Sequence, residues 1–260
     1  MNKIKDFLVE DKEKEDSNFK KGANLFLALF LLIGLFALSL GDYQMNWASL
    51  MQYGGKLFDG YKMTLILTFF AMIVSLMLGF VIAFLNKSRI LVVHYLSQTY
   101  IEIIRGTPFL VQIIFFFYII TPALGLNNRY VIGVTILAIF SSAYVSEIIR
   151  AGIESIAESQ HETSRPVGFT TLQKYRYVIF PQVFKRILPS LAGQLSSLVK
   201  DSSLLSVIAV SEFTLNIQEI TAINFRTYEN YIVLALGYLL ITFPISLISR
   251  RLERKYNYES

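Results

Sequence analysis

The sequence has no cysteine, only two histidines, and charged residues at just 17% of its 260 positions. Without cysteine the chain forms neither disulfides nor thiolate metal sites. Neither His94 nor His161 has the companions that a metal site or a catalytic centre needs, so we expect no metal and no bound cofactor. Ordinary soluble domains carry about 25% charged residues. The hydrophobic content of 54% and the mean hydropathy of +0.50 also exclude that class.

Four stretches of the chain contain no charged residue. They lie between Lys21 and Asp42, Lys62 and Lys87, Arg105 and Arg129, and Glu229 and Arg250, and they hold 20, 24, 23 and 20 residues. A helix needs roughly 20 apolar residues to cross ~30 Å of hydrocarbon, where lipid offers the backbone no hydrogen bonds. Together with two less uniform segments, they predict an all-α integral membrane protein with six transmembrane helices. The expected ranges are 24–40, 63–85, 91–120, 130–152, 187–210 and 231–250.

Lysine and arginine are unevenly distributed over the expected loops and tails. With the N-terminus inside, the segments on that side hold 18 of them, and those on the other side hold 4. The positive-inside rule therefore places both termini and the loop 150–186 in the cytoplasm. The net charge of +5 is a topology signal rather than a nucleic-acid footprint.

The segment NWASLMQYGGKLFDGYK follows the first expected span on the outer side. It mixes Trp47, Met51 and Phe58 with polar residues, a pattern typical of an element lying in the membrane interface. An ordinary connecting loop explains the same pattern.

A long polar segment in the second half of the chain contains a helix-start signal. Ser159 and Glu162 form an S-x-x-E capping box, which predicts a short helix beginning near Gln160. Pro166 and Gly168 then limit this helix to under two turns.

A second capping box follows in the same segment. Thr170 and Gln173 open another helix, which Pro181 should limit. The alternative is a plain loop between two spans, although about thirty residues exceed what a connector needs.

Several motifs resemble, in order, those of bacterial ABC-transporter permeases for polar amino acids such as histidine, glutamine, arginine and cystine. The family's cytoplasmic signature, Glu-Ala-Ala, three residues, then Gly, corresponds here to Glu162-Thr163-Ser164 and Gly168, so two alanines are replaced. Pro166 also stands where the family keeps a helix former. The other motifs read YIEIIRGTPFLVQIIFFFY, SSAYVSEIIRAGIESI, IFPQVFKRILPS and LVKDSSLLSVI.

The resemblance covers about residues 57–254 and implies a type I ABC importer permease fold. It implies that the short cytoplasmic helix is a coupling helix that docks into a separate ATPase subunit. The coupling residues would be Ser159, Glu162, Thr163, Ser164 and Gly168. Residues 1–56 would add a cytoplasmic tail, an extra helix and an external segment, and 255–260 a cytoplasmic tail.

Two acid and base pairs lie within the expected spans. Glu102 and Arg105 are three residues apart on the third span, and Glu147 and Arg150 repeat that spacing on the fourth. Charges at membrane depth usually face a partner or a wet cavity. Structural ion pairs that steady helix packing are one interpretation of these residues.

The third expected span contains a break signal. As a single helix, 91–120 would measure ~45 Å, longer than the bilayer core is thick. Gly106, Thr107 and Pro108 follow Arg105 and weaken the helix there. A helix that resumes at Thr107 or Pro108 would offer free amides beside Arg105, a receiver for a substrate carboxylate. A simple proline kink is the alternative.

A polar run interrupts the fifth expected span. Lys200, Asp201, Ser202 and Ser203 are too polar for a lipid-facing surface, so we expect them at a dimer interface or along a substrate passage.

No Gly-x-x-x-x-Gly-Lys-Ser/Thr phosphate loop occurs in the sequence, so ATP and Mg²⁺ would be bound by a partner ATPase dimer. The resemblance implies a transport subunit, not an enzyme, in a bacterial cytoplasmic membrane. It would import a polar L-amino acid with a second permease copy or homologue and an extracytoplasmic binding protein.

Two other classes remain as alternatives. An ion-driven secondary carrier would show inverted repeats, and none is visible. A membrane enzyme would need convergent catalytic groups, which the scattered histidines do not provide.

Overall fold

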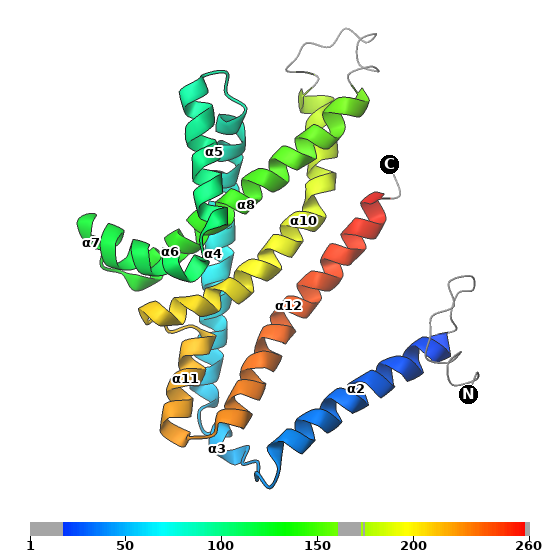
Figure 1. Cartoon of the computed structure of the whole chain (residues 1–260), viewed down its shortest axis with the longest axis vertical. Helices are drawn as coiled ribbons and strands as arrows, with labels where there is room; N and C mark the ends of the chain where they lie inside the picture. The colour runs from blue at the N-terminus through cyan, green and yellow to red at the C-terminus, as the bar shows by residue number, and fades with distance from the viewer. Residues whose placement is uncertain (1–17, 161–172, 174, 258–260) are drawn as a thin grey trace. The chain divides into compact units, whose positions relative to one another are not determined.

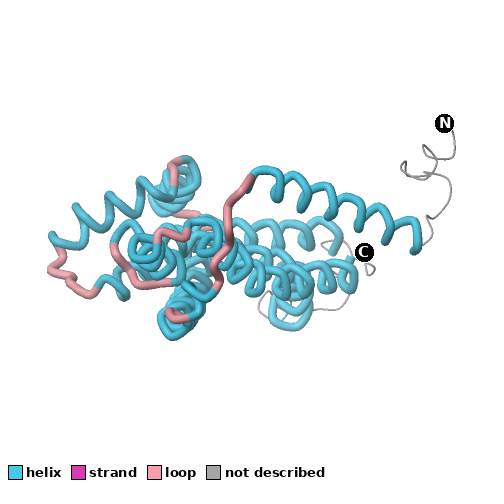
Figure 2. Tube along the Cα trace, turned by 90° about the horizontal axis from the view of Figure 1, so that it is seen from below, coloured by secondary structure: helices cyan, strands magenta, loops and turns pink. Residues whose placement is uncertain are grey.

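The computed structural model describes residues 18–160, 173 and 175–257, and every regular element in these ranges is helical. Figure 2 shows these helices joined by short loops. The chain divides into two compact units, Met1–Met45 and Asn46–Ser260. The boundary expected at residue 56 rests on the extent of the family resemblance, and it stays a prediction.

The described part of the first unit is the helix α2, Asn18–Leu40. It has no charged residue after Lys21 and contains the first expected span, 24–40. Phe30, Leu35 and Leu38 are among its exposed side chains.

Three helices of the second unit are long and apolar enough to cross a membrane. They are α4 (Gly54–Asn86), residues 129–156 of α8 (Arg129–Gln160), and residues 227–256 of α12 (Thr227–Asn257). A fourth candidate is α5 (Leu91–Gly106) taken together with the bent segment that follows it. The coordinates thus support three or four spans among the described residues, and the count of six stays a prediction.

The third expected span, 91–120, is not one helix. After α5 the chain bends by 110° into α6 (Phe109–Phe115), the π-helix η1 (Phe116–Ile120) and α7 (Thr121–Ala123). The expected break at Gly106–Pro108 is present. After it, the chain turns away from the axis of α5 instead of continuing along it. A bend this large exceeds a simple proline kink.

The fifth expected span, 187–210, has different bounds in the structure. A π-helical turn, η3 (Tyr175–Ile179), leads into α10 (Phe180–Asp201), which is followed by the 3₁₀-helix η4 (Ser202–Ile208). Pro181 lies in the first turn of α10 instead of separating two helices, because proline fits helix starts well. Lys200 and Asp201 therefore stand at a helix end and not in the middle of a span.

The segment that begins the second unit is fixed to the start of α12. The Asn46 amide donates to Glu229 Oε1 at 2.6 Å, just before α3 (Ala48–Met51). The helix α11 (Phe213–Asn224) contacts both α4 and α12. Asn216 of α11 donates from Nδ2 to the Lys56 carbonyl at 2.8 Å, which holds α11 against the start of α4.

The core joins buried residues of α4, α8 and α10. Figure 1 shows α10 lying between α8 and α12. One face of α4 buries small residues at helical spacing, including Ala71, Ser75, Gly79 and Ala83. Small residues let helix backbones approach closely in a membrane. A methyl group on Gly79 would overlap the Val145 side chain of α8, so any larger residue there would force the two helices or this side chain to shift.

The contact between α8 and α10 provides a test of this packing. A methyl group on Gly152 would overlap Cγ2 of Ile187, whereas one on Gly193 would meet nothing within 4 Å. Gly152→Ala should destabilise the protein by about 1–3 kcal/mol through overpacking. Gly193→Ala should be neutral or stabilising by up to about 1 kcal/mol, through helix propensity. Thermal unfolding of the purified variants in detergent measures both changes.

Ile187→Ala removes the overlapping methyl group and supplies the control. In combination with Gly152→Ala it should cost less than the two single changes added together. Strict additivity would show that the α8–α10 contact does not have this geometry.

Candidate functional site

Arg105 stands at the end of α5, one residue before the chain leaves helical geometry at Gly106–Thr107. Thr107 and Pro108 are both extended, with ψ angles of 147° and 134°. The Phe109 ring then packs on Phe140 of α8, with ring centroids 4.0 Å apart. The broken backbone is thereby anchored on α8, and Arg105 lies beside that helix.

The guanidinium of Arg105 faces α8. Its Nη1 lies 3.3 Å from Glu147 Oε2, and its Cζ lies 5.5 Å from the centre of the Tyr144 ring. The sequence spacing instead suggested Glu102 as its neighbour, yet Glu102 forms no ion pair with any residue in the described ranges. The side chain of Arg105 is 45% exposed and donates one long hydrogen bond, so most of its hydrogen-bond donors remain accessible.

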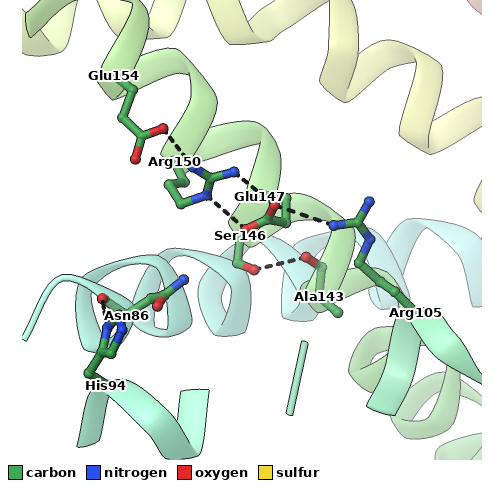
Figure 3. Close-up of polar contacts among 8 residues, drawn as sticks. All are labelled: Asn86, His94, Arg105, Ala143, Ser146, Glu147, Arg150 and Glu154. Carbon is green, nitrogen blue, oxygen red and sulfur yellow. Dashed lines mark hydrogen bonds and ion pairs between the residues drawn. The ribbon is translucent and has the colours of Figure 1, made fainter. Parts of the chain in front are cut away.

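Glu147 joins Arg105 to a row of charges along α8. Arg150 donates to both Glu147 oxygens, at 2.9 Å from Nε and 3.0 Å from Nη2, and pairs with Glu154 at 2.5 Å. Figure 3 shows these four side chains in a row, with Arg105 at one end. The Glu147 carboxylate is thus shared between two helices, and Arg150 holds it in place.

Two cavities border this row of charges. One, of about 580 Å³, includes Tyr144, Arg186 and Gln194 in its wall. The other, of about 510 Å³, includes His94, Gln98 and Glu102. Arg105, Glu147 and Arg150 line both. The Arg105–Glu147 pair is therefore reached from two sides by spaces large enough for a small polar molecule.

The polar run near the end of α10 lies apart from these cavities, whose walls do not include Lys200–Ser203. Ser202 is buried and donates to the Val199 carbonyl at 2.8 Å, and Ser203 donates to the Lys200 carbonyl at 2.6 Å. The serine hydroxyls thus bond within their own helix turn, while Lys200 is exposed.

The expected coupling residues are described only in part. The backbone of Ser159 lies in the last turn of α8, which runs on to Gln160, so Ser159 does not precede a new helix start there. The reason is that α8 extends beyond the expected span end at residue 152. Glu162, Thr163, Ser164 and Gly168 lie outside the described residues.

His94 makes a local contact at the start of α5. His94 Nδ1 lies 2.5 Å from the Asn86 carbonyl, a local bond that fixes the ring at the start of α5. Within the described ranges, no group of three or more His, Asp or Glu residues could hold a metal ion. His161 lies outside those ranges.

A buried carboxylate at the start of α11 was not expected from the sequence. Glu212 accepts hydrogen bonds from the amides of Thr214 and Leu215 at 2.9 and 2.8 Å, and from the Tyr238 hydroxyl at 2.8 Å. Burial raises the pKa of the Glu212 carboxyl, and the two amides act in the opposite direction. Glutamate is not a preferred helix cap, so no local signal marks it. Glu212 joins α11 to α12, away from the cavities.

Comparison with known proteins places this geometry in a family. Residues 75–258 match the model of the binding-protein-dependent transport system inner membrane component. The chain belongs to this family. The glutamine transport system permease protein GlnP of Escherichia coli is 34% identical over 214 residues, which cover 82% of this chain and 98% of GlnP. The probable glutamine ABC transporter permease protein GlnM of Bacillus subtilis is 34% identical over 217 residues, covering 82% and 100%.

Solved structures agree with the family. A chain of an amino acid ABC transporter with histidines matches with a TM-score of 0.76 and 37% identity, covering 82% of this chain and 100% of that one. A chain of the MetNI methionine ABC transporter matches with a TM-score of 0.62 at 16% identity, over 82% and 99%, and shows the fold alone. This family member has the type I importer permease fold and is a multi-pass transport component, not an enzyme. The comparisons give no support to an ion-driven carrier.

The two glutamates near Arg105 provide a matched test of the charge network. Glu147→Gln removes the carboxylate that pairs with two arginines, so it should lower the stability of the purified protein by roughly 1 kcal/mol, given its partial exposure. Glu102→Gln, the same change on α5, should stay within about 0.5 kcal/mol of the parent. Thermal unfolding at low ionic strength measures both, and equal losses would contradict the pairing described here.

Proposed function

We propose that this chain is the membrane permease of an ABC importer and that it moves a polar L-amino acid into the cell. Relatives with 34% identity over most of their length are permeases named for glutamine, which supports an amino acid as cargo. An amino acid also carries charged groups that are complementary to the side chains beside the break between α5 and α6. Which polar amino acid is carried depends on contacts to its side chain. The proposal rests instead on the α-carboxylate and α-ammonium groups that all amino acids share.

The observation that carries the proposal is the pairing of Arg105 with Glu147 between two cavities. An amino acid presents one carboxylate and one ammonium on the same carbon. The guanidinium of Arg105 is complementary to the carboxylate, and the Glu147 carboxylate is complementary to the ammonium. A substrate that enters between them exchanges one ion pair for two, without leaving either side chain unpaired.

The geometry of the pair favours this exchange. A single Nη1 contact at 3.3 Å is long for a charge-assisted hydrogen bond and leaves the two-pronged face of Arg105 free. Glu147 keeps its two bonds from Arg150 when Arg105 moves to the substrate. We propose that Gly106, Thr107 and Pro108 complete the receiving site by opening the helix there, and that Lys200, Asp201, Ser202 and Ser203 line a further part of the pathway.

The remaining assembly follows from the resemblance to importer permeases. We propose that residues 57–254 form the transport core and that six spans cross the membrane, with both termini in the cytoplasm. The core would work with a second permease copy or homologue, an ATPase dimer that binds ATP and Mg²⁺, and an extracytoplasmic binding protein. The loop with Glu162 and Gly168 would couple the core to the ATPase.

Substitution of Arg105 tests the carboxylate role. Arg105→Lys keeps the charge but loses the planar fork, so uptake should persist with a half-saturating concentration about tenfold higher. Arg105→Ala should reduce uptake roughly 100-fold, while assembly with the ATPase stays normal. Uptake of radiolabelled glutamine into proteoliposomes that hold the complete transporter measures both.

A double variant separates this role from a purely structural one. If Arg105 serves only to pair with Glu147, neutralising both residues by Arg105→Gln and Glu147→Gln should restore uptake. If they hold substrate, the double variant should transport no better than either single variant.

Substitution of Glu162 tests the coupling loop. Glu162→Ala should weaken binding of the ATPase subunit and lower substrate-stimulated ATP hydrolysis at least several-fold, because the family position of Glu162 lies in the coupling helix. Co-purification and ATPase assays of the reconstituted complex measure these effects. Normal values in both assays would rule out Glu162 as a coupling residue.

A further inference from the structure

The break between α5 and α6 removes the usual partners of two backbone carbonyls. In a continuous helix, the carbonyls of Ile103 and Ile104 would accept hydrogen bonds from the amides of residues 107 and 108. Thr107 is extended, with φ −116° and ψ 147°, and Pro108 has no N–H. Lipid offers no replacement donors, so both carbonyls need partners from the protein.

Two side chains supply these partners. Thr107 Oγ1 donates to the Ile103 carbonyl at 2.8 Å, and Gln112 Nε2 donates to the Ile104 carbonyl at 2.7 Å. The same Nε2 also lies 3.1 Å from the Thr107 carbonyl and 2.8 Å from Thr107 Oγ1. Gln112 belongs to α6 and Ile104 to α5, so this amide bridges the two arms of the bend.

Gln112 is buried, with 7% of its surface exposed, and its neighbours Phe109 and Ile113 lie in the core cluster with α8. The amide therefore has little room for another position. Ile104 precedes Arg105 directly, so a bond to its carbonyl fixes the helix turn that carries the guanidinium. In the sequence, Gln112 is the only polar residue between Phe109 and Phe117, which is the one signal that marks it.

We propose that Gln112 is a positioning residue, whose amide holds the bend between α5 and α6 and so keeps Arg105 opposite Glu147. Its effect on substrate rests on the function proposed above, but its effect on the bend does not. Two measurements therefore separate the two claims.

Spin labels measure the bend directly. The chain has no cysteine, so Val92→Cys on α5 and Val111→Cys on α6 give one pair per chain at exposed positions, and dilution with unlabelled chains suppresses distances between copies. With Gln112 present, double electron–electron resonance should give one narrow distance distribution. Gln112→Met keeps the volume but removes the donors, so the distribution should broaden or shift. An unchanged distribution would overturn the proposal, whatever the substrate site is.

Uptake tests the consequence for Arg105. Gln112→Met should raise the half-saturating concentration about tenfold with little change in maximal rate per assembled transporter. Combined with Arg105→Lys it should add little, because both changes disturb one contact. The matched control is Gln52→Met, which removes the exposed bond from Gln52 Nε2 to the Ser49 carbonyl and should leave uptake unchanged.

A merely structural role predicts other results. It would lower the yield of assembled transporter without changing the half-saturating concentration, and its effects would add to those of Arg105→Lys. If Gln112→Met does not fold, Gln112→Asn provides a second test, because its amide is one methylene shorter and should not reach the Ile104 carbonyl. Normal distances and normal apparent affinity in Gln112→Asn would then overturn the proposal.

Discussion

The contact between the Arg105 guanidinium and the Glu147 carboxylate joins the broken segment to α8, and the candidate site depends on it. A charge at membrane depth costs at least about 2.5–3.5 kcal/mol on insertion scales, so both groups need a partner or water. Here they have each other, a row of charges along α8, and two cavities. This arrangement keeps the pair both stable and accessible, as the proposed binding and release of a zwitterion requires.

The position of this contact follows from packing and backbone bonding around it. Small residues on α4 let α8 approach closely, and Gly152 allows the same for α10. Phe109 fixes the start of α6 on Phe140. Gln112 donates a hydrogen bond to the Ile104 carbonyl, which the helix break leaves without its usual backbone partner. Each of these contacts is local, yet together they set the distance between two side chains that are 42 residues apart in sequence.

The sequence predicts the parts of the fold that depend on composition and local signals. Charge-free stretches identified α4 and α12, and a less uniform apolar segment identified α8, because hydrocarbon selects against charge regardless of the neighbours. Gly106 and Pro108 identified the break but not its 110° angle, which depends on Phe109 and Gln112 packing against other helices. Spacing suggested Glu102 as the neighbour of Arg105, whereas helix packing brings Glu147 closer. The capping box at Ser159 predicted a new helix start near Gln160, whereas the structure keeps both residues within α8.

The central claim, that Arg105 receives the substrate carboxylate, is tested most directly by solid-state NMR of the reconstituted transporter. Glutamine labelled with ¹³C at its carboxylate would be added to protein labelled with ¹⁵N at the arginine guanidinium groups, and Arg105 would be assigned by its loss in Arg105→Lys. The account predicts a dipolar coupling that corresponds to about 4 Å between the substrate carboxyl carbon and the Arg105 guanidinium nitrogens. A bound glutamine whose carboxylate shows no coupling to Arg105 would contradict it.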